Sequence, residues 1–114
     1  MAEDIKEFYI EFPKAVQKMA QDIPDVVKGF QGLVEKSLAP GALDTKVKEF
    51  VALGIAVAQH CVPCIYLHTQ KAVAAGATRK EIMEAAGVGV LMAGGPGFTH
   101  VAEVIKALDA LNAA

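Results

Sequence analysis

Two cysteines spaced three residues apart are the residues of this 114-residue chain with the clearest capacity for chemistry. Cys61 and Cys64 are its only cysteines, and His68 follows four residues after the second. On one helix, positions separated by three and by seven return close to the same azimuth, so the three side chains share an arc of about 60°. The two sulfurs can then approach disulfide distance, with the imidazole one turn beyond Cys64. This spacing indicates a redox-active dithiol with a histidine beside it.

The start of that helix and a carboxylate are two further features that can make a thiol reactive. Pro63 favours a helix that begins near Cys61, and the free N–H groups at a helix start stabilise a thiolate over a thiol. Glu49 lies twelve residues before Cys61, on the preceding predicted helix. A tight break would fold the two helices together, but spacing alone leaves open whether Glu49 meets His68. If they meet, the carboxylate holds the imidazole and the pair can take a proton from a thiol.

The same residues also have simpler interpretations. The cysteines could be half of a zinc site together with His68, although the usual second pair of ligands is absent. The thiols could instead be inert core residues, because free cysteine is often buried. Glu49 alone could be a solvated charge in the first turns of its helix. His60 and His100 are better explained as packing or capping residues than as catalysts.

The elements that must position these residues are predicted to be helices throughout. No segment shows the sustained alternation of a strand between turn signals, and good helix formers dominate the composition. Pro13 is expected to break or kink the first helix, whereas Gly87 and Gly89 suggest close approach of their helix to a neighbour. The predicted segments are a helix over residues 4–21, one starting at Asp22–Asp25 with an Asp as its cap and ending before Ala39, a buried one capped by Asp44, one from about Cys61 to Gly76, one opened by a Thr78–Glu81 capping box, and one near 99–111 after a break at 94–97.

Length, composition and charge bound the class of protein. Residues 1–114 are expected to form a single domain. Hydrophobic residues make up 54% of the chain, above the roughly 45–50% that is usual, and association with other copies would bury the excess. The net charge is −2 and no basic stripe exists, which argues against nucleic acid as a partner. The acidic N-terminus lacks a signal peptide, and no apolar run approaches the roughly 20 residues of a membrane span, so we expect a cytoplasmic protein.

The four candidate residues together match a known pattern. Glu49, eleven residues, Cys61-Val62-Pro63-Cys64, three residues and His68 resemble the Glu-x11-Cys-x2-Cys-x3-His signature of the AhpD-like alkylhydroperoxidases, which belong to the larger carboxymuconolactone decarboxylase family. The resemblance extends over about residues 40 to 112 and includes a Gly-Gly-Pro segment after the apolar helix. It implies an all-α fold, a compact bundle of about six helices assembled as a homotrimer or homohexamer.

The resemblance also implies a reaction and a role for each residue. In a thiol-dependent peroxidase of this type, Cys64 would attack the peroxide, Cys61 would resolve the product, and Glu49 with His68 would form the proton relay. A dithiol electron-donor protein would restore the pair, and no metal or cofactor is expected. The same dithiol could instead reduce protein or small-molecule disulfides. In that reaction Cys61 could lead, since the helix-start argument alone favours it.

One departure from the family pattern bears on the choice between these reactions. Pro63 stands where the best-known peroxidases of the family have a further His before the second cysteine. The Val62-Pro63 insert resembles the Cys-Gly-Pro-Cys of thioredoxins and suggests disulfide exchange, although the missing βαβ pattern excludes the thioredoxin fold. Lesser alternatives are a non-redox, lactone decarboxylase-like enzyme that uses Glu49 and His68, and a binding module with a redox-sensing or zinc-linked cysteine pair.

Overall fold

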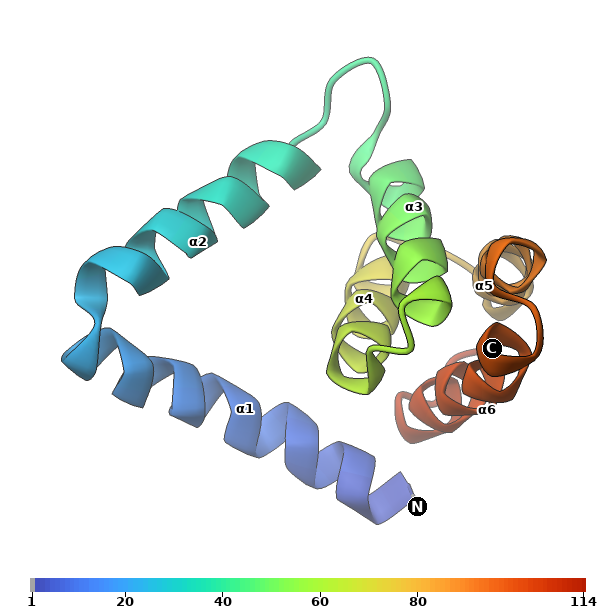
Figure 1. Cartoon of the computed structure of the whole chain (residues 1–114), viewed down its shortest axis with the longest axis horizontal. Coiled ribbons are helices and arrows are strands. Elements are labelled where there is room, and N and C mark those ends of the chain that lie inside the picture. The colour runs from blue at the N-terminus through green and yellow to red at the C-terminus, as the bar shows by residue number, and fades with distance from the viewer. Residues whose placement is uncertain (1) are drawn as a thin grey trace.

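The computed structural model describes residues 2–114, with side chains from Asp4 onward. Within this range the regular secondary structure is entirely helical, which confirms the predicted all-α fold. Among the residues described, no helix combines the length and apolar character needed to cross a bilayer. The helices are α1 (Ala2–Asp22), α2 (Pro24–Leu38), α3 (Thr45–Ala58), α4 (Val62–Ala74), α5 (Arg79–Ala93) and α6 (Gly95–Ala110) (Figure 1).

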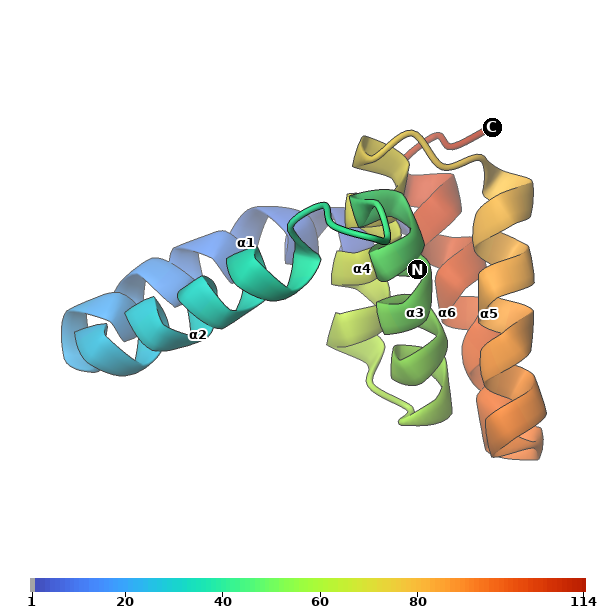
Figure 2. The ribbon, with the colours of Figure 1, turned by 90° about the horizontal axis from the view of Figure 1, so that it is seen from above.

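Four of these helices form the body of the molecule. Helix α3 packs against both α4 and α5, and α6 closes the bundle against the same two helices (Figures 1 and 2). Apolar side chains from all four helices fill the centre, and burying each large one contributes about 1.5–3 kcal/mol to folding. The buried core residues are Leu53, Ala56, Val57, Ile65, Ala72, Ile82, Ala86, Val104 and Leu108.

Helices α3 and α5 approach each other closely at a pair of glycines. A Cβ atom at Gly89 would lie 2.5 Å from the Gly54 carbonyl oxygen and 3.0 Å from the Val57 Cβ, so this position excludes a side chain. The predicted close approach is therefore confirmed at Gly89. It is wrong at Gly87, which is exposed and where a Cβ would meet nothing within 4 Å.

Local sequence chemistry accounts for the ends of several helices. Asp44 caps α3 by accepting a hydrogen bond from the Val47 N–H at 2.8 Å. Thr78 and Glu81 form the predicted capping box at the start of α5, each side chain accepting from the other residue's N–H. After α4, Gly76 adopts the left-handed conformation with φ +94°, the conformation that favours glycine directly after a helix.

Three expected boundaries differ in the structure, each at a proline. Helix α1 runs unbroken through Pro13, because a proline forfeits only one hydrogen bond when its neighbours keep theirs. Ile23, and not an Asp, is the N-cap of α2, because Pro24 occupies the first helical position and constrains the residue before it. Helix α6 begins at Gly95 rather than near residue 99, because Pro96 fits a first helical turn and Gly94 alone makes the bend.

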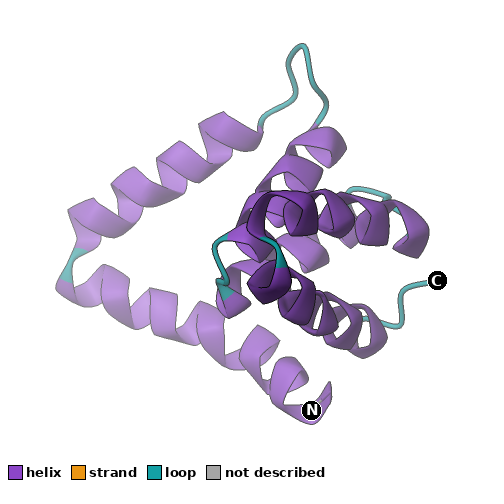
Figure 3. Ribbon diagram, turned by 45° about the vertical axis from the view of Figure 1, so that its right-hand side comes forward, coloured by secondary structure: helices purple, strands orange, loops and turns teal. Residues whose placement is uncertain are grey.

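Helices α1 and α2 together form a helical arm that extends away from the body (Figures 1 and 2). Figure 3 shows the same separation from another direction. The arm is anchored near its beginning, where Ile5 is buried and the Tyr9 hydroxyl donates to the Tyr66 carbonyl oxygen at 2.6 Å, and at its end, where the Thr45 hydroxyl donates to the Leu38 carbonyl oxygen at 2.8 Å. Helix α2 has no buried residue. The arm consequently presents much apolar surface that this chain does not cover.

Candidate active site

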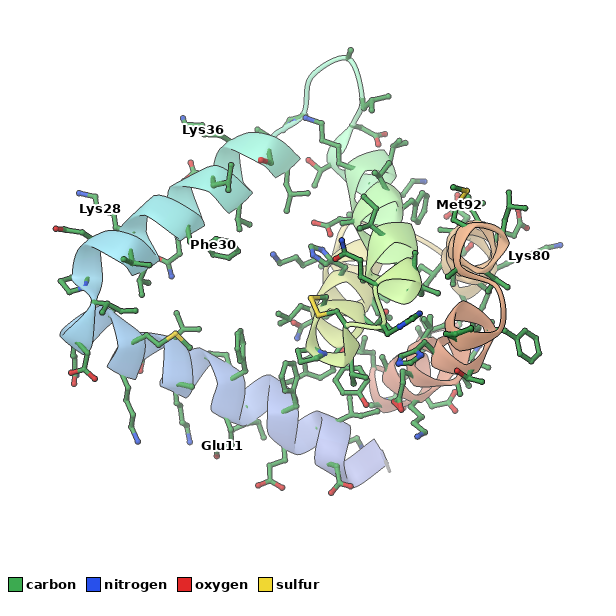
Figure 4. The ribbon with its side chains drawn as sticks, viewed as in Figure 1. Glu11, Lys28, Phe30, Lys36, Lys80 and Met92 are labelled. Atoms are coloured by element: carbon green, nitrogen blue, oxygen red, sulfur yellow. A yellow bond between two sulfur atoms is a disulfide. The ribbon has the colours of Figure 1, made fainter. Side chains whose placement is uncertain are left out.

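The two cysteines lie at the start of α4, as the sequence predicts. Cys61 is the N-cap of the helix, and Cys64 is the third residue of its first turn. They are joined by a disulfide bond with a Cα–Cα distance of 5.2 Å, seen as the yellow bond in Figure 4. Pro63 between them supplies no N–H and has the φ that a first turn requires. Cys61 itself has extended backbone angles (φ −94°, ψ 96°), so the spacing brings the sulfurs together between the N-cap and the first turn of α4.

The start of α4 directs a hydrogen bond at one of these sulfurs. The Cys64 N–H points to the Cys61 Sγ atom, with the nitrogen 3.3 Å from the sulfur. Ser, Thr and Asp oxygens usually accept this bond at an N-cap, and here a sulfur takes their place. An anionic sulfur accepts an N–H more strongly than a neutral one, so this geometry favours negative charge on Cys61 when the disulfide is reduced.

Glu49 and His68 meet across the interface of α3 and α4. The His68 Nδ1 atom lies 2.7 Å from Glu49 Oε1, a short hydrogen bond between residues 19 apart in the sequence. Glu49 is only 2% exposed, so the interpretation as a solvated surface charge is wrong. The spacing of the residues left open whether Glu49 meets His68, and the packing of α3 on α4 brings the two side chains together.

This contact defines what the imidazole can do. An ionised carboxylate only accepts hydrogen bonds, so opposite an ionised Glu49 the Nδ1 atom of His68 is the donor, and in a neutral ring with that tautomer Nε2 has the free lone pair. His68 is one helical turn after Cys64 on α4, on the same face of the helix. Its side chain is 24% exposed, which leaves the ring open to solvent and to a small reactant. The four predicted site residues thus gather at the α3–α4 interface.

The other two histidines form a separate pair. His60 precedes Cys61 in the left-handed conformation with φ 59°, and its ring stacks on that of His100 with centroids 5.0 Å apart. The Nδ1 atom of His100 is 2.7 Å from the Pro96 carbonyl oxygen, one turn earlier in α6. Stacking and a backbone hydrogen bond agree with the predicted packing role of both residues.

A tyrosine network beside the site was not evident from the sequence. Tyr66, two residues after Cys64, donates its hydroxyl to Glu103 Oε2 at 2.7 Å, and its carbonyl accepts from Tyr9. Burial and the bond to Glu103 raise the pKa of Tyr66 to about 12, and burial with the nearby Tyr66 raises the pKa of Tyr9 well above its ordinary value. Burial alone would raise the pKa of Glu103. The hydrogen bonds from Tyr66 and Lys106 lower this pKa by more than burial raises it, so it lies below its usual range. The network ties α1, α4 and α6 together around the first turns of α4.

The site has no ready set of metal ligands. Among the described residues, no group of three or more His, Cys, Asp and Glu side chains is placed to hold a metal ion. What the geometry defines is an all-helical protein with a cysteine pair at a helix start and a carboxylate–imidazole pair one turn away.

Comparison with known proteins places this class of site in a family. The sequence profile of the carboxymuconolactone decarboxylase family matches residues 24–107, and the chain belongs to this family. An uncharacterised protein of Cupriavidus necator is 32% identical over 113 residues, covering 99% of this chain and all of that protein. The match therefore spans the helical arm as well as the body.

Solved structures have the same fold. The crystal structure of apo-lpg0406, a carboxymuconolactone decarboxylase family protein from Legionella pneumophila, superposes with a TM-score of 0.88 at 34% identity, covering 94% of this chain and 96% of that one. A family protein from Thermotoga maritima, TM1620, described as "possibly involved in antioxidative response", superposes with a TM-score of 0.82 at 26% identity, over 91% and 89% of the two chains. The identification of an AhpD-like, carboxymuconolactone decarboxylase family fold from four residues is thereby confirmed.

Proposed function

We propose that the protein is a thiol-dependent peroxidase in which Cys64 attacks the peroxide. One observation carries the proposal: the buried carboxylate of Glu49 holds His68 at 2.7 Å, one turn from a cysteine whose partner is already at disulfide distance. A carboxylate-held imidazole is the arrangement that turns a nearby thiol into a nucleophile. The description of the Thermotoga relative in terms of an antioxidative response agrees with this reaction class.

The reaction proceeds in three balanced steps. In the reduced protein, His68 Nε2 takes the proton of the Cys64 thiol, and the thiolate attacks the outer oxygen of a hydroperoxide. The O–O bond breaks, the proton passes from His68 to the leaving alkoxide, and Cys64 becomes a sulfenic acid. The Cys61 thiol then condenses with the sulfenic acid, forming the disulfide and releasing water. A dithiol protein reduces the disulfide by exchange and is itself oxidised, which requires a reducing compartment such as the cytoplasm.

A second candidate, a disulfide reductase, is favoured by the hydrogen bond at Cys61. The N–H of Cys64 points at Cys61 Sγ, so the start of α4 stabilises negative charge on this sulfur rather than on Cys64. In that reaction Cys61 attacks a substrate disulfide, and Cys64 then displaces the substrate thiol by attacking the mixed disulfide. The two functions therefore assign the first attack to different cysteines.

Single cysteine variants distinguish the two functions. With peroxide as substrate, Cys64→Ser should abolish turnover, and Cys61→Ser should accumulate a sulfenic acid that a 1,3-dicarbonyl reagent traps. With a disulfide substrate, Cys61→Ser should abolish turnover and Cys64→Ser should accumulate a mixed disulfide. His100→Gln, which alters a histidine outside the Glu49 pair, is the matched control and should retain the wild-type rate. Undiminished peroxide consumption by Cys64→Ser would rule out the peroxidase mechanism.

Assembly as a homotrimer or homohexamer is part of the same proposal. The arm leaves large apolar side chains exposed, and a lone domain gains stability by covering them. Sedimentation velocity at micromolar concentration should show a species of three or six chains. A single species with the mass of one chain would contradict this part of the proposal.

A further inference from the structure

The outer helix of the arm carries an apolar ridge that the described residues of its own chain leave largely exposed. Val26, Phe30 and Leu33 follow one side of α2 and are 64%, 64% and 60% exposed. Figure 4 shows Phe30 pointing from α2 toward the side where the body lies, whereas Lys28 and Lys36 point outward. A helix of 15 residues is marginal on its own, since most helical stability in proteins comes from packing of the apolar face. The ridge therefore needs a surface to cover it.

A groove of matching character lies on the body, between α3 and α5. It has a volume of about 550 Å³, and small residues form its floor where the helices meet at Gly54 and Gly89. Large apolar side chains form its rims, with Val51 53% and Met92 77% exposed. Of the residues that line the groove, only Gln59 is polar and none is charged. A groove with a small-residue floor accepts the large side chains of a helix laid into it.

The ridge and the groove have similar lengths but cannot meet within one copy. The ridge covers residues 26–33, and the groove is lined by residues within 50–59 and 85–92, which corresponds to about 12 Å for the ridge and about 15 and 12 Å for the groove at 1.5 Å per residue. The arm extends from one side of the body, and α5 with Met92 lies on the other (Figures 1 and 4). A contact between two different surfaces of identical chains is heterologous, and it generates a ring when the rotation closes.

We propose that the α2 ridge of one copy occupies the α3–α5 groove of a second copy. This assignment names the surfaces of the assembly and goes beyond the redox function, on which it does not depend. The six large apolar residues exposed on the arm are each about half exposed and represent roughly 600 Å² of surface, of which the three ridge residues supply roughly half; a standard stable interface buries about 800 Å² per partner, so the contact would extend beyond the ridge. These six are Ile10, Met19, Ile23, Val26, Phe30 and Leu33.

The contact also has a consequence for the site. Figure 4 shows the disulfide at the edge of α4 that faces the arm, on the side toward which Phe30 points. A second copy seated on the ridge therefore covers the approach to Cys61 and Cys64 from this one side and slows bulky reagents that come from it, whereas a dithiol donor must reach the disulfide from another side. In the single chain the His68 side chain is 24% exposed.

Cross-linking tests which surfaces meet. Cys61 and Cys64 are the chain's only cysteines, so Cys61→Ser/Cys64→Ser provides a background without thiols. In this background, Phe30→Cys combined with Met92→Cys and treated with a short flexible bismaleimide should give covalent multimers. Phe30→Cys alone and Met92→Cys alone should remain single chains. Multimers from Phe30→Cys alone would show arm-to-arm pairing instead, and single chains from the double variant would equally overturn the proposal.

Charge substitutions in the wild-type background test the energetics and the effect on the site. Phe30→Asp and Met92→Asp should each convert the assembly to single chains in sedimentation velocity, whereas Lys28→Asp on the outer side of α2 should not. Circular dichroism confirms that each variant keeps its helices. After reduction, the cysteines of Phe30→Asp should react at least several-fold faster with a bulky thiol reagent than those of Lys28→Asp. A Met92→Asp variant that stays assembled, or equal thiol rates in dissociated and assembled protein, would overturn the arrangement.

Discussion

Replacing Glu49 by Gln tests the proposed proton relay with little change in the shape of the core. The Glu49 side chain is 2% exposed and accepts from His68 Nδ1 at 2.7 Å. Glutamine has the same size and keeps a carbonyl acceptor, but it lacks the charge. Hydrogen bonds to charged groups contribute about 1.5–3 kcal/mol and neutral ones about 0.5–1.5 kcal/mol. The substitution should thus weaken the hold on a protonated His68 by about 1–2 kcal/mol.

This loss predicts a fall of roughly 5- to 30-fold in the rate at which Cys64 reacts with peroxide, since about 1.4 kcal/mol corresponds to a factor of ten. Replacing the imidazole itself with His68→Gln should cost more, about 100-fold or beyond, because a positioned acid–base group contributes about 10²–10⁴. Because Glu49 acts through His68, Glu49→Gln should have no further effect once His68 is replaced. The two effects are therefore expected to be strongly non-additive.

Stopped-flow measurement of peroxide reacting with the reduced protein gives the four rates of this double-mutant cycle. Glu84→Gln makes the same chemical change on the exposed surface of α5 and should leave the rate unchanged. A wild-type rate in Glu49→Gln, or independent losses that add in the double variant, would refute the relay.

Four further substitutions test the packing of the helices and the contacts beside the site. Gly89→Ala should destabilise the protein by about 1–3 kcal/mol and lower the thermal midpoint, because its Cβ would meet Gly54 O at 2.5 Å; Gly87→Ala, with open space around it, should gain up to about 1 kcal/mol. Tyr66→Phe should cost about 1 kcal/mol at neutral pH. The pKa of the Tyr66 hydroxyl in the folded protein is raised to about 12. The stability that this hydroxyl provides is therefore present below the ordinary pKa of tyrosine and is lost as pH rises from that value toward 12. Urea titrations at several pH values should show a smaller loss of stability at alkaline pH in Tyr66→Phe than in the wild type. Pro13→Ala should slow amide hydrogen exchange in α1, since a proline inside a helix costs about 3 kcal/mol relative to alanine, and unchanged exchange would contradict the continuous helix.

The parts of the fold that local chemistry determines could be predicted from the sequence. The Asp44 cap and the Thr78–Glu81 box involve groups three residues apart, and the structure has both. The same is true of Cys61 and Cys64, which are also three residues apart, at the N-cap and in the first turn of α4. Periodicity within one helix needs no knowledge of tertiary packing.

Features that depend on how helices cross could not be predicted in this way. The Glu49–His68 bond joins two helices, and the Tyr66–Glu103 bond joins residues 37 apart. Both require the angle and register of α4 against its neighbours. The helix boundaries at prolines also depend on tertiary packing. A helix tolerates a proline such as Pro13 when packing of the rest of the helix stabilises it, and the sequence alone does not reveal that packing.

The burial of Glu49 is itself an argument for a function at this site. A carboxylate that is 2% exposed loses its hydration, and one hydrogen bond to an imidazole offsets this cost only in part. A bundle selected for stability alone would do as well or better with an apolar residue there. The cost is understandable if the pair must move protons for the cysteine one turn away. The Glu49–His68 bond is present while the disulfide is formed, so the proposed relay would need no rearrangement for the step in which reduction returns protons to the two sulfurs.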